Sequence, residues 1–466
     1  VELYSRLVNL EYLSARAIVR YTKGMNYGFV KPGRLYKKDF AIKVHAADSA
    51  FYNRLYTDIS ADPVQAMLNS VPQDSIYLAV MQEYRTLLEH KDWNFDEIQE
   101  TGGINYKSGA KNQNITAIAK RLAITGEYIP VISKDNTLAD SLDNSSENTE
   151  EQELTPELLA AINVFRQKNS LPINEKEVGD ATIRALNRSL DYYKIKLRAN
   201  LERYRWRRIK QPADRHIEVN VAAFLLFATE KGKEPLVMKV CAGKPTSKTP
   251  MLESNISYIN LNPKWNVPVN IAKNEISLLQ KKDPTYLQRH NMKLYEAGTE
   301  IDHNSIDWLA VNPAKFDYSI IQEPGGGNSL GRLKFMFNNE FSVYLHDTPL
   351  KSAFNRLNRA VSHGCIRVQQ PLDLAYFLTS ADDLYKDRIR YSIGYDPETE
   401  DGIKALKADK LKKLPDIIIM DKNKKITLFI DYFTVYKHPA DNKLYYADDV
   451  YEYDAAILEH LNRIPI

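Results

Sequence analysis

Apolar residues recur at helical spacing in the first part of the chain. They fall every three or four positions near the start and again from residue 76 to residue 88: Leu3, Leu7, Leu10, Leu13, Ile76, Val80, Met81, Tyr84 and Leu88. This period gives a helix one apolar face. No group of residues with obvious chemistry occurs here, so residues 1–105 are predicted to form a helical scaffold.

Residues 106–190 are expected to form a small domain, with a helix and turn at 114–128 and more helical sequence after an insertion. The first helix after the insertion is the clearest. Thr155 can cap it, Pro156 suits its first position, and three apolar residues share one face: Leu158, Ile162 and Phe165. Inside this domain, residues 135–153 contain no Lys or Arg and many Asp, Glu, Ser and Asn, which predicts a flexible acidic loop.

A basic helix is expected over residues 191–212, where it bridges to the next domain. Its arginines, Arg203, Arg205, Arg207 and Arg208, are interpreted as a solvated face. From His216 the pattern changes to the alternation typical of strands, as in Ile217, Val219 and Val221. We therefore predict a mainly β catalytic domain over 213–393, interrupted by an insertion at about 266–321. Residues 394–466 form a C-terminal extension with a short β pair around 417–432.

Composition narrows the class of protein. The 466 residues are 44% hydrophobic and 26% charged with a net charge of +3, which is too small to indicate nucleic-acid binding. No stretch reaches the roughly 18 apolar residues of a membrane span. The chain begins at Val1 and opens into helix-like sequence, so a missing N-terminal signal or anchor is expected to be its only link to a membrane.

Only two cysteines are present, so no disulfide framework is possible. Cys241 ends the apolar run 236–241 and is predicted to be a buried structural thiol. Cys365 lies instead in Ser362-His363-Gly364-Cys365-Ile366-Arg367, downstream of His346. Only a thiolate is a strong nucleophile, so a cysteine enzyme needs a base and N–H groups that hold the oxyanion. His346 can be the base, and the amides of Gly364 and Cys365 can face the oxyanion.

The segment Phe341–His346 reads as a strand. Alternation would turn Phe341, Val343 and Leu345 to the core, and would turn Ser342, Tyr344 and His346 to the opposite face. The same alternation sends the Asp347 side chain away, so a Cys-His-Asp triad is not expected. A backbone carbonyl is the expected partner of the second ring nitrogen of His346.

The pattern of a histidine followed by Ser-His-Gly-Cys and an arginine two places on resembles the L,D-transpeptidases of the YkuD family. Three further segments are similar to the large multidomain members of the family. They are 322–335, Trp265-Asn266-Val267-Pro268 and Asp431-Tyr432-Phe433-Thr434. The resemblance implies that 106–190 is a peptidoglycan-binding-like domain and that 266–321 caps the active-site groove. It also implies a multidomain α+β fold.

The resemblance further implies that Cys365 attacks a peptidoglycan stem tetrapeptide, releases D-Ala, and passes the acyl group on to form a 3→3 cross-link. Tyr344, His363, Arg367 and Ser362 are then expected to bind substrate. Water or a free D-amino acid would be alternative acceptors, and carbapenems would acylate the same thiol. We expect no cofactor and no metal, a monomer, and a location in the periplasm or cell envelope.

Other interpretations fit less well. A papain-like hydrolase would have its cysteine first and its histidine far downstream. A metal site of His346, Asp347 and His363 lacks the usual ligand spacing. The run 325–331 is rich in glycine, but no Gly-Lys-Ser/Thr follows it, so a tight turn is a better interpretation than a phosphate cradle. A non-catalytic wall-binding protein would not need both Cys365 and His346.

Overall fold

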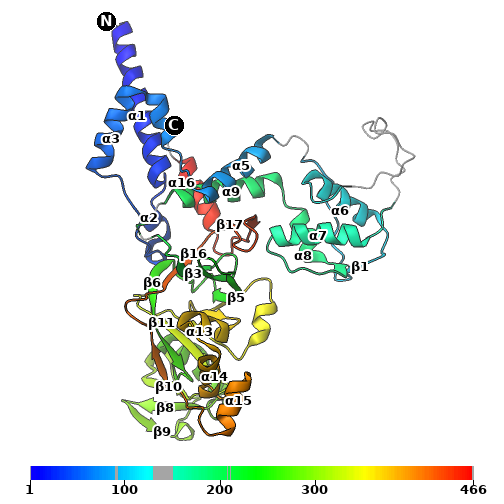
Figure 1. The fold of residues 1–466 in the computed structure, drawn as a ribbon, viewed down its shortest axis with the longest axis vertical. Helices are drawn as coiled ribbons and strands as arrows, with labels where there is room; N and C mark the ends of the chain where they lie inside the picture. Colours follow the sequence, from blue (N-terminus) through cyan, green and yellow to red (C-terminus); the bar gives the residue numbers. More distant parts are fainter. Residues whose placement is uncertain (1, 90–92, 130–150, 207, 210, 464–466) are drawn as a thin grey trace. The chain divides into compact units, whose positions relative to one another are not determined.

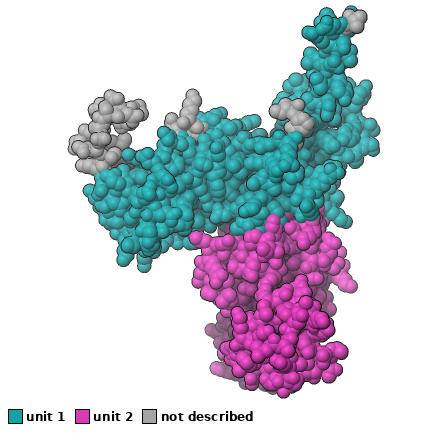
Figure 2. All heavy atoms as spheres, turned by 180° about the vertical axis from the view of Figure 1, so that it is seen from behind, with its two compact units in different colours: residues 1–37, 43–209, 433–466 teal, residues 38–42, 210–432 magenta. Residues whose placement is uncertain are grey.

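A computed structural model describes residues 2–89, 93–129, 151–206, 208–209 and 211–463. Its contacts group the chain into two compact units, coloured separately in Figure 2. Unit 1 comprises residues 1–37, 43–209 and 433–466, and unit 2 comprises residues 38–42 and 210–432. The five regions expected from the sequence stay predictions, and most of the predicted acidic loop lies outside the described residues.

Unit 1 is helical (Figure 1). The N-terminal region forms α1 (Glu2–Tyr27), α2 (Pro32–Tyr36), α3 (Ser49–Ala61), α4 (Pro63–Asn69) and α5 (Ser75–Glu89). Helix α9 (Leu190–Arg205) packs against α5 and against α16 (Tyr453–Asn462), beside the short ribbon of β17 (Val435–Lys437) and β18 (Leu444–Tyr446). The predicted helices at 76–88 and at 3–13 are confirmed. The apolar side chains at the start of α1 are nevertheless exposed, and Leu3 retains 68% of its accessible surface.

A second cluster of unit 1 lies between residues 98 and 186. It contains α6 (Gln113–Ile124), α7 (Pro156–Lys168) and α8 (Asp180–Leu186), with β1 (Tyr106–Lys107) paired to β2 (Glu177–Val178). The Thr155 hydroxyl accepts the N–H of Leu158, and Pro156 is the first residue of α7. Leu158, Ile162 and Phe165 are buried in one shared core, as their helical spacing predicted.

The basic helix α9 differs from its prediction, because part of its charge is buried. Arg203 donates to Asp454 at 2.5 Å, and the Lys196 ammonium lies 3.6 Å from the same carboxylate. Side chains of all three are at most 3% exposed. Thr434 also donates to Asp454 at 2.8 Å. We call Arg203, Lys196 and Asp454 the Asp454 cluster. The solvated-face interpretation was wrong here because the carboxylate that pairs these cations comes from a distant helix, α16.

Unit 2 is built on a sheet that closes on itself. Its strands follow the order β11-β12-β14-β5-β4-β3-β16-β6, and β6 pairs with β11 to complete a barrel. Their bounds are β3 (Arg215–Asn220), β4 (Leu225–Glu230), β5 (Leu236–Gly243), β6 (Leu252–Leu261), β11 (Leu333–Phe337), β12 (Leu345–His346), β14 (Ile366–Val368) and β16 (Thr427–Asp431). The sheet also includes β13 (Ala360–Ser362), paired to β5. Three helices follow in sequence: α13 (Pro371–Thr379), α14 (Asp383–Ser392) and α15 (Glu400–Lys407).

The segment between β6 and β11 forms a separate four-stranded sheet at one end of unit 2 (Figure 1). Its strands are β7 (Trp265–Asn266), β8 (Met292–Glu296), β9 (Thr299–Ile301) and β10 (Tyr318–Gln322), with the short helices α10 (Val269–Ile271), α11 (Ser277–Lys282) and α12 (Tyr286–Arg289). This segment has its own hydrophobic core, which includes Leu287, Leu294 and Ile320.

The β pair expected around residues 417–432 is not formed. Strand β15 (Ile417–Ile419) and strand β16 each pair with β6, and β16 also pairs with β3 in parallel. The prediction was wrong because two strands close in sequence were assumed to pair with each other, whereas the long β6 accommodates both along one edge.

Candidate active site

Four neighbouring strands bring a row of polar side chains together in unit 2. Lys334 on β11 pairs with His346 on β12, His346 pairs with Arg367 on β14, and Arg367 pairs with Cys241 on β5. Directly opposed residues share one face of a sheet with Cβ atoms about 5 Å apart. We call Lys334, His346 and Arg367 the His346 row, since the imidazole lies between two cations.

The strand predicted over 341–346 is shorter than expected. Only Leu345–His346 is a strand, because Ser342 takes a left-handed conformation with φ of 57°. The Asn339 side chain accepts the N–H groups of Phe341 and Val343, which stabilises a turn before the strand. Val343 and Leu345 are buried as alternation predicted, while Phe341 is half-buried.

The orientation of His346 is as predicted. Its Nδ1 lies 2.5 Å from the backbone carbonyl of Asp347, so Nδ1 carries the proton and Nε2 has the free lone pair. The Asp347 carboxylate does not reach the imidazole. It accepts instead from the backbone N–H of Arg332 at 2.9 Å and from Lys351 at 2.6 Å. Asp347 therefore supports His346 through the backbone and not as a triad acid.

The thiol of Cys365 is half-buried, and it interacts with Tyr344. Burial raises the pKa of Cys365, while hydrogen bonds from the backbone and hydroxyl of Tyr344 and the charges of Lys334 and Arg367 oppose that rise. Among the described residues no hydrogen bond joins Cys365 to His346. His346 pairs with Arg367, and Ile366 donates to the Tyr344 carbonyl at 3.0 Å. Cys365 therefore lies two residues before the partner of His346, beside Tyr344.

The loop before Cys365 has a specific backbone conformation. Gly364 has φ of 115°, which side-chain-bearing residues rarely adopt. Its carbonyl accepts the hydroxyl of Thr249 at 2.8 Å, and its N–H donates to Ser362 at 3.2 Å. The Ser362 hydroxyl in turn donates to the Cys365 carbonyl at 2.5 Å. Ser362 is thus a loop-forming residue in this state, and the Gly364 amide predicted for the oxyanion is engaged with it.

The two cations of the His346 row have no carboxylate partner among the described residues. The Nε of Arg367 is buried without a hydrogen bond, and burial lowers the pKa of both Arg367 and Lys334. The Lys334 ammonium lies 3.9 Å from the centre of the Tyr344 ring. Burial, followed by the charges of Arg367 and Lys334, lowers the pKa of His346 to about 3. The imidazole is therefore neutral at pH 7.

His363 does not line this row. It is exposed, and its Nε2 lies 2.5 Å from the Glu275 carboxylate, which belongs to a π-helical turn of the inserted segment, Ala272–Ile276. Trp265 of the same segment hydrogen-bonds through its indole to the Tyr344 hydroxyl. The inserted segment therefore makes one contact with the loop before Cys365 and one with the residue before β12.

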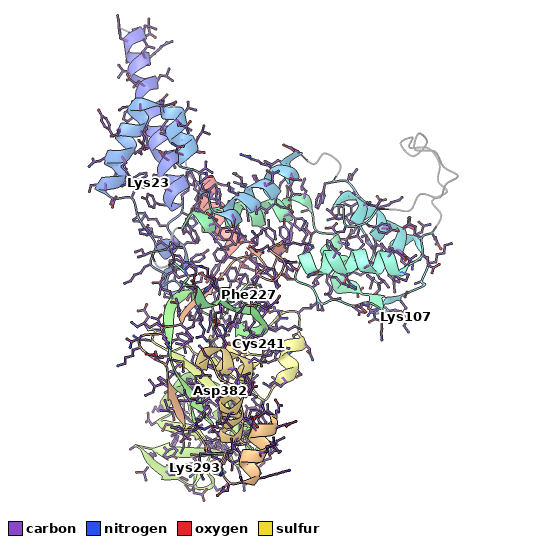
Figure 3. The ribbon with its side chains drawn as sticks, in the orientation of Figure 1. Lys23, Lys107, Phe227, Cys241, Lys293 and Asp382 are labelled. Atoms are coloured by element: carbon purple, nitrogen blue, oxygen red, sulfur yellow. The ribbon has the colours of Figure 1, made fainter. Side chains whose placement is uncertain are left out.

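Three residues of this site were absent from the sequence prediction: Lys334, Trp265 and Glu275. Lys334 had a usable signal, since it alternates with the buried Leu333 and Phe335 on a strand and so must face the other side. Glu275 had none. Cys241 is fully buried, as predicted for a structural thiol, and Figure 3 shows it within the β-rich part of unit 2.

The barrel thus holds a neutral imidazole between two cations on adjacent strands, with a thiol in the loop before β14. This set of groups suits acyl transfer through a cysteine. Comparison with known protein families finds one matching family. Residues 214–390 match the family model of YkuD, the L,D-transpeptidase catalytic domain. The match agrees with the family that the Ser-His-Gly-Cys motif predicted.

A protein of Haemophilus influenzae named "Putative L,D-transpeptidase" is 35% identical over 163 residues, which cover 35% of this chain and 33% of that protein. The match thus spans about a third of the curated relative. A solved L,D-transpeptidase from Mycobacterium smegmatis is 17% identical over 35% of this chain and 54% of its own, with a TM-score of 0.19. One from Xylanimonas cellulosilytica is 10% identical over 71% of this chain and all of its own, with a TM-score of 0.21. At these TM-scores, the family assignment rests on the sequence matches.

Proposed function

We propose that the protein is an L,D-transpeptidase that forms 3→3 cross-links in peptidoglycan through a thioester on Cys365. The observation that carries the proposal is the His346 row beside the Cys365 thiol, within a segment of the YkuD family. Cations without an acidic partner next to a nucleophile fit a substrate that brings its own carboxylate, as a stem tetrapeptide ending in D-Ala does.

Acylation starts from a neutral thiol and a neutral imidazole. As the Cys365 sulfur attacks the carbonyl carbon of the third stem residue, His346 Nε2 takes the thiol proton. The tetrahedral intermediate then collapses, the C–N bond to D-Ala breaks, and His346 returns the proton to the departing amine. A thioester and free D-Ala result.

A bound carboxylate makes this proton transfer easier. In the free site, Arg367 and Lys334 lower the pKa of His346, so an imidazolium is unfavourable there. The terminal carboxylate of the donor, placed against Arg367, would offset that positive charge and raise the basicity of His346 as the thiol loses its proton. The site is thereby selective for donors with a free carboxylate.

The second half-reaction uses the side-chain amine of a diamino acid on another stem. The amine attacks the thioester carbonyl, the C–S bond breaks, and the proton lost by the amine returns to the sulfur through His346. Water in place of the amine gives L,D-carboxypeptidase activity, and a D-amino acid gives exchange. Two steps through one acyl-enzyme predict ping-pong kinetics.

The rest of the chain fits a role in the cell envelope. In this proposal, residues 106–190 bind wall peptidoglycan, and the inserted segment caps the groove through the Glu275–His363 and Trp265–Tyr344 contacts. Carbapenems acylate Cys365, and the protein works as a monomer in the periplasm. No helix in the described part of the chain is both long and apolar enough to cross a membrane.

The test is product analysis with a disaccharide-tetrapeptide. The wild type is expected to release D-Ala and to form tetrapeptide–tripeptide dimers, both detected by liquid chromatography and mass spectrometry, while Cys365→Ala forms neither. Tripeptide without dimer would favour the carboxypeptidase alternative. If the folded, reduced wild type released no D-Ala, a non-catalytic wall-binding role would replace the proposal.

A further inference from the structure

Unit 1 contains a cavity of about 560 Å³ that the catalytic proposal does not use. Four arginines line it: Arg16 and Arg20 from α1, and Arg198 and Arg205 from α9. No Asp or Glu is among the described residues that line it. The cavity is therefore lined by four positive side chains and no acid, which favours an anionic ligand.

The arginines are not all engaged with acids of the protein. Among the described residues no ion pair involves Arg16 or Arg198, and Arg198 donates only to the Asn462 side chain at 3.3 Å. Arg205 pairs with Glu202 at 3.2 Å, yet its Nε is buried without a hydrogen-bond partner. The cavity therefore retains guanidinium donors that can bind phosphate oxygens, which suit their planar geometry.

The remaining wall is mainly apolar, and Tyr21 and Tyr84 are its polar side chains. Leu13, Leu201 and Leu461 line it with Phe29, whose ring lies 5.3 Å from the Arg205 guanidinium. A phosphate group alone would fill only a small part of such a volume, which is within the range of sites for whole small molecules, about 300–1,000 Å³. A peptide would need partners for its backbone polar groups, and this wall offers few. A hydrocarbon chain needs none.

We propose that this cavity, which we call the arginine cavity, binds an anionic phospholipid, with the phosphate among the arginines and the acyl chain against the leucines. The exposed apolar side chains at the start of α1 precede Leu13 and Arg16 on the same helix. Leu3 and Leu10, which are 68% and 63% exposed, lie within the two or three turns before the cavity. This binding is independent of the proposed transpeptidase reaction.

The test titrates the purified chain with short-chain, monomeric dioctanoyl-phosphatidylglycerol by calorimetry. We expect one site, with affinity falling at least tenfold in the double variant Arg16→Gln/Arg198→Gln. The matched control Arg34→Gln/Arg54→Gln removes the same charge from exposed positions of unit 1 outside the cavity and should bind as the wild type does. A second variant, Leu13→Ser, should weaken the lipid but not inorganic phosphate.

Three outcomes overturn the proposal. They are no binding of the monomeric lipid, equal weakening in the two double variants, and equal or tighter binding of inorganic phosphate or of an acidic peptide. Both double variants alter exposed or partly exposed side chains, so thermal unfolding should confirm that each remains folded.

Discussion

The Asp454 cluster of unit 1 buries two cations and the His346 row of unit 2 contains two half-buried cations, but only the first contains a carboxylate. In unit 1, Arg203 and Lys196 share Asp454, and all three side chains are almost fully buried. In unit 2, Lys334 and Arg367 flank a neutral histidine and have no acidic partner among the described residues. Buried charge is costly unless it is paired. The first arrangement is therefore structural, and the second is suited to an anion from outside.

Removing the carboxylate from the Asp454 cluster should have the largest effect on stability. Asp454→Asn removes the carboxylate that pairs directly with buried Arg203 and Lys196, so we expect a loss of about 3–5 kcal/mol in the free energy of unfolding. Chemical denaturation measures it. The control is Asp448→Asn, whose carboxylate pairs with Arg188 but is 62% exposed, and which should cost less than about 1 kcal/mol. If the two variants lost the same free energy of unfolding, Asp454 would not be a structural counter-charge. The contrast with the His346 row would then fail.

Removing a cation from the His346 row should instead affect activity. Arg367→Gln loses a charge-assisted contact to substrate, worth about 10- to 100-fold in kcat/KM. The free energy of unfolding should stay the same or rise, since a buried cation without a partner is removed. Arg388→Gln, at a partly exposed position of α14 outside the His346 row, is the control. If Arg367→Gln unfolded easily and retained full kcat/KM, the cation would be structural.

The neutral His346 predicts a pH dependence of stability. Its pKa is about 3 in the folded protein against 6.5 ordinarily, so between these values the unfolded chain binds a proton that the folded protein does not. Stability should therefore fall on acidification below 6.5, by about 1.4 kcal/mol per pH unit from this residue. Denaturation of wild type and His346→Gln from pH 7 to pH 4 measures the difference. If the free energy of unfolding fell equally with pH in the two proteins, the imidazole of His346 would not be neutral and buried.

The contact between Glu275 and His363 should have the smallest effect, because both side chains are partly exposed. Glu275→Gln is expected to change kcat/KM by no more than about threefold, through a looser inserted segment. Glu300→Gln breaks a comparable pair with Lys293 in the same segment and should change nothing. A loss of a hundredfold in Glu275→Gln would mean that the carboxylate takes part in the chemistry.

Local patterns predicted much of this structure. The motif around Cys365 predicted the family, alternation predicted the burial of Val343 and Leu345, and helix signals placed α7 at Thr155 and Pro156. Pairing over long distances was not predictable. The His346 row depends on the register of β11, β12 and β14, and the burial of Arg203 depends on Asp454, 251 positions later. A single sequence does not reveal these registers, so the position of Lys334 beside His346 was not predicted, although alternation indicated which face of its strand it occupies.

The central claim is that the thiol beside the His346 row accepts the acyl group. Intact-mass spectrometry of the reduced protein with a carbapenem, and separately with a disaccharide-tetrapeptide, tests it most directly. We predict one adduct on the wild type and on Cys241→Ala, and none on Cys365→Ala. An unmodified wild type, or an adduct that persists in Cys365→Ala, would contradict the account.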